Sequence, residues 1–515
     1  MTEANERWAW VLGDQLSLRD GPAARYDKVL LIESNRFAAR KQYHPQKLTV
    51  VFSAMRHFRD RLREDGMTVH YEVSPDFETG LARFFEANPD VTLEVMAPTS
   101  HRARVGLKRA VDTAGGDIEV VGNQMFLCST AAFEAWLGDQ VGTSQPDPGA
   151  IPKHETFYRW MRRRTGYLME GDKPAGGQWN YDEQNRETPP AEYEPPSPPT
   201  FEVDALTRRV HERVCQEFDG WGSESLDPLY WPVTRTQARR ALRRFVEERL
   251  PDFGAYQDAM VEDAWALNHA LLSPALNLGL LGPAEVIEAV IEAGARDEVP
   301  LNAVEGVVRQ LLGWREYVRQ VYRLTMPEMA AANQLGADRE LPPAYWVPDS
   351  TEMACLSDSV EGVYERGYAH HIQRLMVLSN FALLYGVDPA ALNEWFHVGF
   401  VDAYHWVTTP NVIGMGVFGT DTLATKPYAA SANYIDRMSD YCDGCAFDPD
   451  ATTGEGACPF NALYWDFLAR HEEELRDNYR MGLVYSHLDD KRGSELDAIR
   501  ARAAALKEGI ADGEI

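Results

Sequence analysis

The sequence predicts an α/β domain followed by a larger all-α domain. Two observations predict this arrangement. Five short apolar runs alternate with helical segments up to residue 121, and helical periodicity alone continues from 205 to 485. A stretch rich in glycine, proline and acidic residues lies between the two regions, at 171–199. We therefore expect an α/β domain over 1–135, a connector over 136–204, a helical domain over 205–490 and a charged tail over 491–515.

The run at 8–13 is typical of a buried strand, and the run at 29–33 is a second apolar strand. The alternation of the five apolar runs with helices indicates a doubly wound sheet. Ligands of such sheets bind beyond the carboxyl ends of the strands, so we expect a site near Asp14, Gln15 and Glu33. No GxGxxG motif is present, which argues against a dinucleotide site of the Rossmann type. The strands are expected at 8–13, 29–33, 69–73, 91–96 and 118–121, and the helices at 46–65, 76–88 and 101–114.

The second domain is expected to consist of long amphipathic helices. Gly386, Pro389 and Pro410 separate the later ones. One short helix carries five arginines, and a second basic cluster in the connector lies beside three aromatic residues. These clusters suit a nucleic-acid surface, although solvated helix faces explain them equally well. The long helices are expected at 283–294, 301–324, 360–384 and 389–400, and the basic residues are Arg235, Arg239, Arg240, Arg243 and Arg244, with Arg159, Arg162, Arg163 and Arg164 beside Tyr158, Trp160 and Tyr167.

The overall charge argues against non-specific nucleic-acid binding. Lys plus Arg number 51 and Asp plus Glu number 79, a formal net charge of −28. A local basic groove remains compatible with this balance. No apolar stretch reaches the roughly 18 residues of a membrane span. The opening residues Met1 to Arg7 are polar, and the apolar run after them is too short for a signal peptide. We expect a monomeric cytoplasmic protein with no membrane partner.

Four of the six cysteines suggest a metal site. Cys442, Cys445 and Cys458 follow a Cys-x2-Cys-x12-Cys-Pro pattern, and Cys355 lies far upstream. Four thiolates with such a pattern are what an iron–sulphur cluster needs. Zinc is the main alternative, although zinc sites more often pair CxxC with a second CxxC or with two histidines. The remaining interpretation is that these cysteines are small buried residues or disulphide partners. The other cysteines, Cys128 and Cys215, are expected to be packing residues.

Nine segments, in order along nearly the whole chain, resemble the photolyase/cryptochrome superfamily. Within it the chain is similar to the iron–sulphur bacterial cryptochromes and photolyases, also called prokaryotic (6-4) photolyases. Each segment is weak alone, and the set gains its specificity from its order and from the four cysteines. The segments are Leu12–Leu16, Phe52–Phe58, Arg164–Met169, Gly176–Asn180, Leu271–Asn277, Gly313–Tyr317, His370–Met376, Pro410–Met415 and Lys426–Ser431.

The resemblance implies FAD in the helical domain and a 4Fe–4S cluster on Cys355, Cys442, Cys445 and Cys458. Ser273 begins a predicted helix, where free N–H groups favour a phosphate, although a simple helix start would look the same. Arg374 and Asp402 resemble the superfamily's pair across the flavin ring, and a structural salt bridge is the alternative. The implied FAD contacts are Tyr256, His269, Leu272, Ser273, Ala275, Leu276, Asn277, Gln310, Trp314, Arg315, Arg374, Asn380, Asp402 and Thr408, the last standing where the iron–sulphur group tends to carry an acid.

The resemblance also implies catalytic residues. His371 is similar to the histidine that gives a proton to the lesion in (6-4) photolyases, while reduced FAD gives an electron. Adjacent helical residues point about 100° apart, so His370 and His371 are not expected to face the same cavity. His370 would shape the pocket. Tyr428 and Tyr434 resemble the tyrosines of the lesion pocket, although ordinary packing would also explain them.

Two further groups of residues follow from the resemblance. Trp346, Trp395 and Tyr404 would form an electron-transfer chain that photoreduces FAD, and core packing is the alternative for each. The antenna chromophore of the group is usually 6,7-dimethyl-8-ribityllumazine, which makes 1–135 an antenna domain. The residues expected to hold it are Asp14, Gln15, Glu33 and Lys47.

Three functions are compatible with these features. The first is a light-driven enzyme that repairs pyrimidine (6-4) photoproducts in UV-damaged DNA. The second is a blue-light sensory cryptochrome with the same cofactors. The third is a light-independent iron–sulphur module that grips nucleic acid. The α/β domain and the His-His motif count against the third, and His371 and Tyr434 favour repair over sensing.

Overall fold

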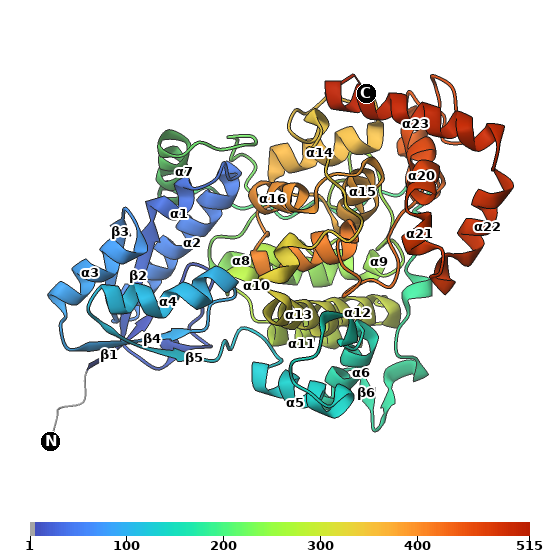
Figure 1. The fold of residues 1–515 in the computed structure, drawn as a ribbon. Coiled ribbons are helices and arrows are strands. Elements are labelled where there is room, and N and C mark those ends of the chain that lie inside the picture. Colours follow the sequence, from blue (N-terminus) through green and yellow to red (C-terminus); the bar gives the residue numbers. More distant parts are fainter. Residues whose placement is uncertain (1–5, 515) are drawn as a thin grey trace.

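The computed structural model describes residues 6–514. The polar segment 1–5 and Ile515 of the expected tail lie outside the described residues. The chain begins with a five-stranded parallel sheet in the order β3-β2-β1-β4-β5 (Figure 1). The strands are β1 (Glu6–Trp10), β2 (Lys28–Ser34), β3 (Thr68–Ser74), β4 (Val91–Met96) and β5 (Asp117–Val121). The predicted doubly wound sheet is therefore confirmed.

Side chains of alternate residues in the sheet enter two different cores, as the twofold periodicity of a strand requires. Ala9, Val29 and Leu31 pack with α2 (Pro45–Glu64), while Trp8, Trp10, Leu30 and Ile32 pack with α3 (Phe77–Ala87) and α4 (His101–Thr113). Asp76 and Ser100 cap α3 and α4 by accepting from backbone N–H groups. The sheet is thus the central layer of three.

One strand is shorter than predicted. The apolar run at 8–13 indicated a strand to Gly13, but β1 ends at Trp10. The chain turns directly afterwards, and the N–H of Gln15 donates to the carbonyl of Leu12 at 2.9 Å. This turn brings Asp14 and Gln15 over the carboxyl end of the sheet, where the sequence places a ligand site.

The connector contains more regular structure than its composition predicts. It includes α5 (Thr130–Val141), α6 (His154–Thr165) and the small hairpin of β6 (Met169–Glu170) and β7 (Lys173–Pro174). Arg162 is fully buried on α6 and donates to the carbonyls of Trp179 and Leu168. The predicted basic cluster is therefore partly structural, since Arg162 holds the connector together and does not reach a surface groove.

The helical domain forms the rest of the molecule. It contains α8 (Arg235–Arg244), α9 (Leu250–Phe253), α10 (Ser273–Leu278), α11 (Pro283–Ala293), α12 (Leu301–Val308), α13 (Glu316–Thr325), α14 (Ala354–Arg366), α15 (Asn380–Tyr385), α16 (Pro389–Gly399), α17 (His405–Thr409), α18 (Ala432–Met438), α19 (Tyr441–Gly444), α20 (Pro459–Arg470), α21 (Glu472–Leu475) and α22 (Gly482–Asp490). Four π-helical segments interrupt or extend these helices, at Phe245–Arg249, Arg309–Arg315, Gln373–Ser379 and Pro410–Gly416. Such segments are frequent at functional sites.

Two helical predictions need correction. The helix expected at 360–384 is broken, because Gly367 ends α14 with φ 62° and its N–H donates to the carbonyl of Val363 at 2.9 Å. The charged tail is an ordered helix, α23 (Ser494–Asp512), which lies across α20 (Figure 1). Ile499, Leu506 and Ile510 bury its apolar face.

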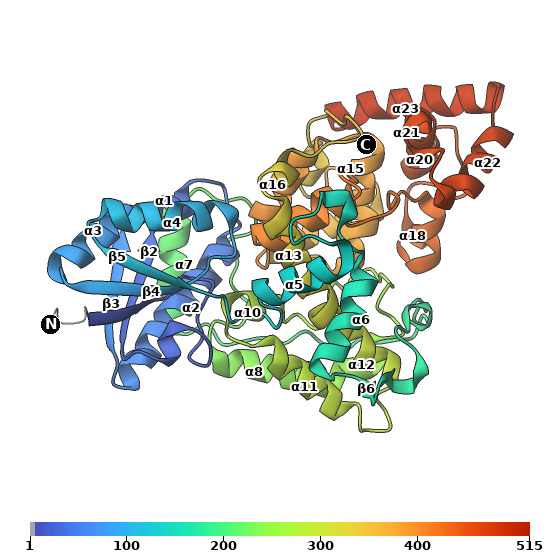
Figure 2. The same ribbon diagram turned by 60° about the horizontal axis from the view of Figure 1, so that its bottom comes forward.

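The helix α7 (Ala205–Glu217) was expected to begin the helical domain, but it packs on α2 of the α/β domain (Figures 1 and 2). Arg213 of α7 forms an ion pair with Glu33 at the end of β2. The α/β domain therefore receives one of its covering helices from beyond the connector.

Within residues 6–514, the helices are all too short or too polar to cross a membrane.

Candidate functional site

Arg374 and Asp402 form a bidentate ion pair near the centre of the helical domain. The two terminal nitrogens of Arg374 donate to the two carboxylate oxygens of Asp402 at 3.0 and 3.1 Å. The guanidinium also lies 4.3 Å from the ring centroid of Phe400 and 4.9 Å from that of Tyr368. The pairing predicted from the sequence is therefore present, and aromatic rings fix the plane of the arginine.

The helix α10 contributes directly to this pair. Ser273 Oγ donates to Asp402 Oδ2 at 2.6 Å, and Asn277 Nδ2 donates to the carbonyl of Asp402 at 2.9 Å. The other end of α10 touches the α/β domain, where the N–H of Leu16 donates to the carbonyl of Leu278 at 2.8 Å. Four of the residues expected around a flavin thus form one cluster, between the α/β domain and the rest of the helical domain (Figure 2).

The two adjacent histidines take different environments, as their helical spacing predicts. His370 is buried and stacks on His269, with ring centroids 4.6 Å apart and an angle of 15°. His370 Nδ1 and His269 Nε2 have no hydrogen-bond partner among the described residues. These orphaned nitrogens are the kind of polar atoms that a bound ligand would satisfy. His371 is exposed to solvent.

All three histidines are held in the neutral form. Desolvation, together with the nearby charge of Arg374, lowers the pKa of His371 to about 4. Desolvation and the neighbouring His371 lower the pKa of His269 to about 3, and the pKa of His370 is also well below its usual value. His371 therefore departs from the near-neutral pKa of an ordinary histidine, because the protein around it disfavours the imidazolium ion.

Some of the remaining residues expected to contact FAD lie on α10 and α17 beside the cluster, and others contact residues elsewhere in the protein. Leu272, Ala275 and Leu276 are buried along α10, and Thr408 is buried on α17. Asn380 forms two hydrogen bonds with the backbone of Ala430, at 2.9 and 3.1 Å. Tyr256 contacts Tyr193, and Gln310 is half-buried in the π-helical segment at 309–315.

Trp314 and Arg315 lie in other surroundings. Trp314 stacks on His154 of the connector, with ring centroids 3.8 Å apart. Arg315 lies over Phe126, 4.1 Å from the ring centroid, and donates to the carbonyl of Met125 at 3.2 Å. Trp314 therefore attaches the connector to the helical domain, and Arg315 attaches the segment that contains Met125 and Phe126.

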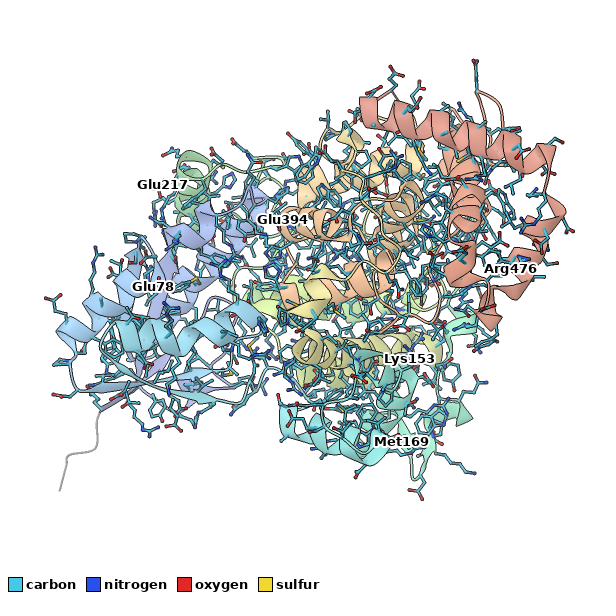
Figure 3. The ribbon with its side chains drawn as sticks, viewed as in Figure 1. Glu78, Lys153, Met169, Glu217, Glu394 and Arg476 are labelled. Carbon is cyan, nitrogen blue, oxygen red and sulfur yellow. The ribbon has the colours of Figure 1, made fainter. Side chains whose placement is uncertain are left out.

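Tyr428 and Tyr434 lie on a charged surface. Arg186, Asp182 and Arg480 are close enough to Tyr428 to act on it electrostatically, and Asp258 and Arg186 act on Tyr434. Burial raises the pKa of Asp258 to about 6. Lys153 of the connector donates to the carbonyls of Asp421 and Thr422 at 2.7 and 3.0 Å, which ties the connector to the loop before Tyr428 (Figure 3).

A chain of tryptophans includes one residue that the sequence did not reveal. Trp395 and Trp346 are joined through Trp221, whose ring centroid lies 5.9 Å from that of Trp395 and 5.4 Å from that of Trp346. Trp395 in turn lies 5.7 Å from Phe400, the ring beneath Arg374. Trp221 stands in a loop without a recognisable motif, so no sequence signal marks it. Tyr404 lies instead in a cluster with Met96, Met125 and Trp406.

Of the four residues expected to hold an antenna, Asp14, Gln15 and Lys47 form single or few hydrogen bonds, whereas Glu33 is already paired with three side chains. Thr99 donates to Asp14 at 3.0 Å, Gln15 donates to the carbonyl of Met96 at 3.1 Å, and Lys47 Nζ donates to the carbonyl of Ala403 at 2.7 Å. Burial lowers the pKa of Lys47 to about 7. Glu33 is fully buried and accepts hydrogen bonds from three side chains, those of Arg56, Tyr71 and Arg213.

The four cysteines predicted to bind metal line a single small cavity. Cys355, Cys442, Cys445 and Cys458 surround it together with the apolar side chains of Met353, Ala432, Ile435, Tyr441, Phe447 and Phe460. All four are free thiols. Desolvation, with repulsion from the other three, raises the pKa of Cys355 well above its usual range. Among residues 6–514, no group of three or more His, Cys, Asp or Glu side chains converges closely enough to hold one metal ion.

The donor set has the chemistry of a thiolate-bound metal site. Four cysteine thiols that line one apolar cavity are the ligands that either a zinc ion or an iron–sulphur cluster uses.

Comparisons with known proteins agree with this geometry. A family model described as deoxyribodipyrimidine photo-lyase-related protein matches residues 9–227. A protein named (6-4) photolyase, from Agrobacterium fabrum, is 41% identical over 510 residues, which cover 96% of this chain and 98% of that protein.

Solved structures share the fold. A cryptochrome from Synechocystis superposes with a TM-score of 0.60 at 14% identity, covering 98% of this chain and 99% of that one. A class III photolyase from Agrobacterium tumefaciens superposes with a TM-score of 0.53 at 15% identity, covering 95% and 99%. Together with the full-length sequence identity, these findings show that the chain belongs to the photolyase/cryptochrome superfamily, within its bacterial (6-4) photolyase family.

Proposed function

We propose that the protein is a light-driven DNA repair enzyme that reverses pyrimidine (6-4) photoproducts, with FAD as its cofactor. The observation that carries this proposal is the placement of an accessible histidine, His371, three residues from Arg374 and beside the Arg374–Asp402 pair. The near full-length identity to a protein named (6-4) photolyase supports it.

Arg374 and Asp402 would bind and orient the edge of the flavin ring. FAD, when reduced and excited by light, supplies an electron to a bound lesion. The ion pair is rigid, because Phe400, Tyr368 and Ser273 fix its two members. A fixed pair of opposite charges presents one donor face and one acceptor face to a heterocycle. The orphaned nitrogens of His269 and His370 would gain partners in the same site.

His371 would hold the proton that the lesion receives. A general acid must lie within hydrogen-bond reach of the atom that it protonates. Because the protein lowers the pKa of His371 to about 4, the residue needs an additional negative charge to become protonated at neutral pH. The phosphates of a bound DNA strand supply such a charge, since a nearby anion raises the pKa of an imidazole. His371 is then charged only when substrate is present.

The DNA would bind across the surface that contains Tyr428. Tyr428 is 39% exposed, and Tyr479 and Leu483, in a later segment of the chain, are 89% and 72% exposed. Asn478 and Arg480 donate to the carbonyl and Oγ1 of Thr425 at 2.6 and 2.7 Å, which fixes this segment to the loop before Tyr428. Exposed aromatic rings beside arginines are suited to stack on bases and to contact phosphates. Tyr428 and Tyr434 would orient a lesion extruded from the duplex.

Three accessory roles complete the proposal. Trp395, Trp221 and Trp346 would deliver electrons that reduce the flavin, since their rings follow one another at short distances. Cys355, Cys442, Cys445 and Cys458 would hold a 4Fe–4S cluster that ties α14, α19 and α20 together. Asp14, Gln15 and Lys47, at the carboxyl end of the sheet and on α2, would hold 6,7-dimethyl-8-ribityllumazine. Glu33 is not part of this pocket in our proposal, because its oxygens are already paired.

The four cysteines would act as free thiols in a reducing cytoplasm, where thiols bind metal and do not pair as disulphides. We also propose that a single chain is the catalytic unit.

The deciding experiment is repair of an oligonucleotide with a single defined (6-4) photoproduct by the reduced, FAD-loaded protein under blue or near-UV light. Restoration of the two pyrimidines, absent in the dark, is the expected result. A protein that binds FAD and is photoreduced, but never repairs the lesion, would be a sensory cryptochrome.

A further inference from the structure

Gln373 connects three elements of the helical domain through its side-chain amide. It is buried at the start of the π-helical segment Gln373–Ser379, two residues after His371. Its Oε1 accepts from the backbone N–H of His370 at 3.0 Å. Its Nε2 donates to Asp358 Oδ2 at 3.0 Å and to the hydroxyl of Tyr441 at 2.9 Å. Tyr441 also donates to Asp358, which closes the network.

The two partners of Gln373 belong to the segments that carry the cysteines. Asp358 lies on α14, one helical turn after Cys355. Tyr441 begins α19 and immediately precedes Cys442, and its ring lines the same small cavity as the four cysteines. A displacement of either cysteine-bearing segment therefore moves a hydrogen-bond partner of Gln373.

The third partner is the turn that presents the histidines. The N–H of His370 precedes the first full turn of the helix that carries His371 and Arg374, so its hydrogen bond to Gln373 Oε1 fixes where that helix begins. We infer that Gln373 is a positioning residue, which couples the cysteine-lined cavity to the orientation of His371 and Arg374. This inference rests on the proposed function, because it assigns the network a role in the proton transfer by His371.

The chemistry of the side chain explains why a glutamine suits this position. Its amide presents an acceptor to His370 and donors to Asp358 and Tyr441 at the same time. In a buried network, an unpaired member costs more than a hydrogen bond contributes, so the three segments are held in one mutual arrangement. Misplacement of a catalytic group by about 1 Å can cost a hundredfold in rate, so holding the start of this helix in place bears on catalysis.

Tyr441→Phe tests the inference with the FAD-loaded, metal-loaded protein. The variant removes the hydroxyl and leaves the ring against the cavity. We expect FAD and metal content to stay at wild-type levels. Hydrogen exchange of the His370 amide should become about fivefold to tenfold faster, which corresponds to the net free energy of one hydrogen bond. Repair kcat should fall by a similar factor, with unchanged affinity for damaged DNA.

Tyr345→Phe is the matched control. Its hydroxyl is also buried and donates to a backbone carbonyl of the same helical run, that of Leu378 at 2.6 Å, but it does not contact Gln373. This control should lower thermal stability without changing exchange at His370. Gln373→Met should reproduce the effects of Tyr441→Phe, and the double variant should be no worse than either single one, because both remove the same network.

Coupling to the cavity is measured by removing its metal. Metal extraction from the wild-type protein should accelerate hydrogen exchange of the His370 amide. In Gln373→Met, where this exchange is already fast, metal extraction should not accelerate it further. Unchanged exchange at His370 in both Tyr441→Phe and Gln373→Met overturns the inference, and so does altered exchange with unaltered repair kcat. Wild-type protein that repairs no lesion contradicts the proposed function alone, because the exchange measurements need no substrate.

Discussion

Arg374 donates to both carboxylate oxygens of Asp402, and one of those oxygens also accepts from Ser273 at 2.6 Å. The carboxylate is therefore shared between a cation on one helical run and a hydroxyl on α10, and it links the two walls of the proposed flavin site. Removal of Arg374 or of Asp402 leaves the other charge in a site built for an opposite charge.

We expect Asp402→Ala to lose FAD. The change leaves the guanidinium of Arg374 partly buried and unpaired, which should lower the free energy of unfolding by about 3 kcal/mol. Flavin absorbance per mole of purified protein and a thermal unfolding curve measure the two effects. Ser273→Ala is the matched control, because it removes a neutral donor and should cost only about 1 kcal/mol. Wild-type flavin content in Asp402→Ala would contradict the proposed site.

His371→Ala should retain FAD and photoreduction but repair (6-4) photoproducts about a hundredfold more slowly, the scale of a lost general acid. Single-turnover repair under light measures this loss. His487→Ala, which alters an exposed histidine on α22, should repair at the wild-type rate. Equal repair rates for His371→Ala and wild type would remove His371 from the mechanism.

Trp221→Phe should slow photoreduction of bound FAD severalfold, because it replaces the ring that joins Trp395 to Trp346. Transient absorbance after a light pulse measures the rate. Trp8→Phe is the control, since Trp8 packs against Phe84 in the α/β domain, away from these three tryptophans. If the two variants are photoreduced at the same rate, Trp221 carries no electrons.

We expect the protein to lose stability in acid because His154 is buried in its neutral form. Burial lowers its pKa to about 3, while an unfolded chain would have a pKa of about 6.5. Below pH 6.5 only the unfolded state binds the proton, so stability present at neutral pH falls as the pH falls. Between pH 6.5 and 5, protonation of this histidine in the unfolded state should lower the free energy of unfolding by about 2 kcal/mol. Denaturant unfolding of His154→Gln should show a correspondingly flatter pH dependence over that interval, and an unchanged slope would contradict the assignment.

Cys442→Ser should lose iron and sulphide together and should give largely insoluble protein, because metal binding contributes folding free energy. Metal and sulphide analysis of anaerobically purified wild type and variant measures this. Cys215→Ser should retain wild-type iron, since Cys215 lies on α7, away from the cysteine-lined cavity. Stoichiometric zinc without sulphide in the wild type would replace the cluster with a zinc site.

The sequence predicts some parts of this structure well because their signals are local. The five strands lie within a residue of the predicted ranges except β1, which begins at Glu6 and ends at Trp10, where the turn before Gln15 breaks the pattern. Arg374, Asp402, Ser273 and Asn277 were grouped correctly, although they lie up to 129 positions apart, because ordered family motifs carried them.

Other parts depend on contacts that no local pattern records. Glu33 looks like a free carboxylate at a strand end, and only the fold reveals that Arg56 and Arg213 neutralise it. Trp221 and Gln373 are inconspicuous in the sequence, since their roles arise from elements far away in the chain. The pKa of His371 likewise depends on desolvation by the surrounding protein and on the charge of Arg374, which sequence spacing cannot express.

The position of α7 determines how the protein can be divided. Phe218, at the end of α7, lies 6.4 Å from Phe52 of α2, and Arg213 neutralises Glu33 at the end of β2. A fragment cut at residue 135 would expose the apolar side of α2 and remove Arg213, one of the two arginines paired with the buried Glu33, so we expect it to aggregate when expressed alone. Exchange of antenna domains between relatives therefore requires a crossover after Phe218, with the connector transferred as part of the module.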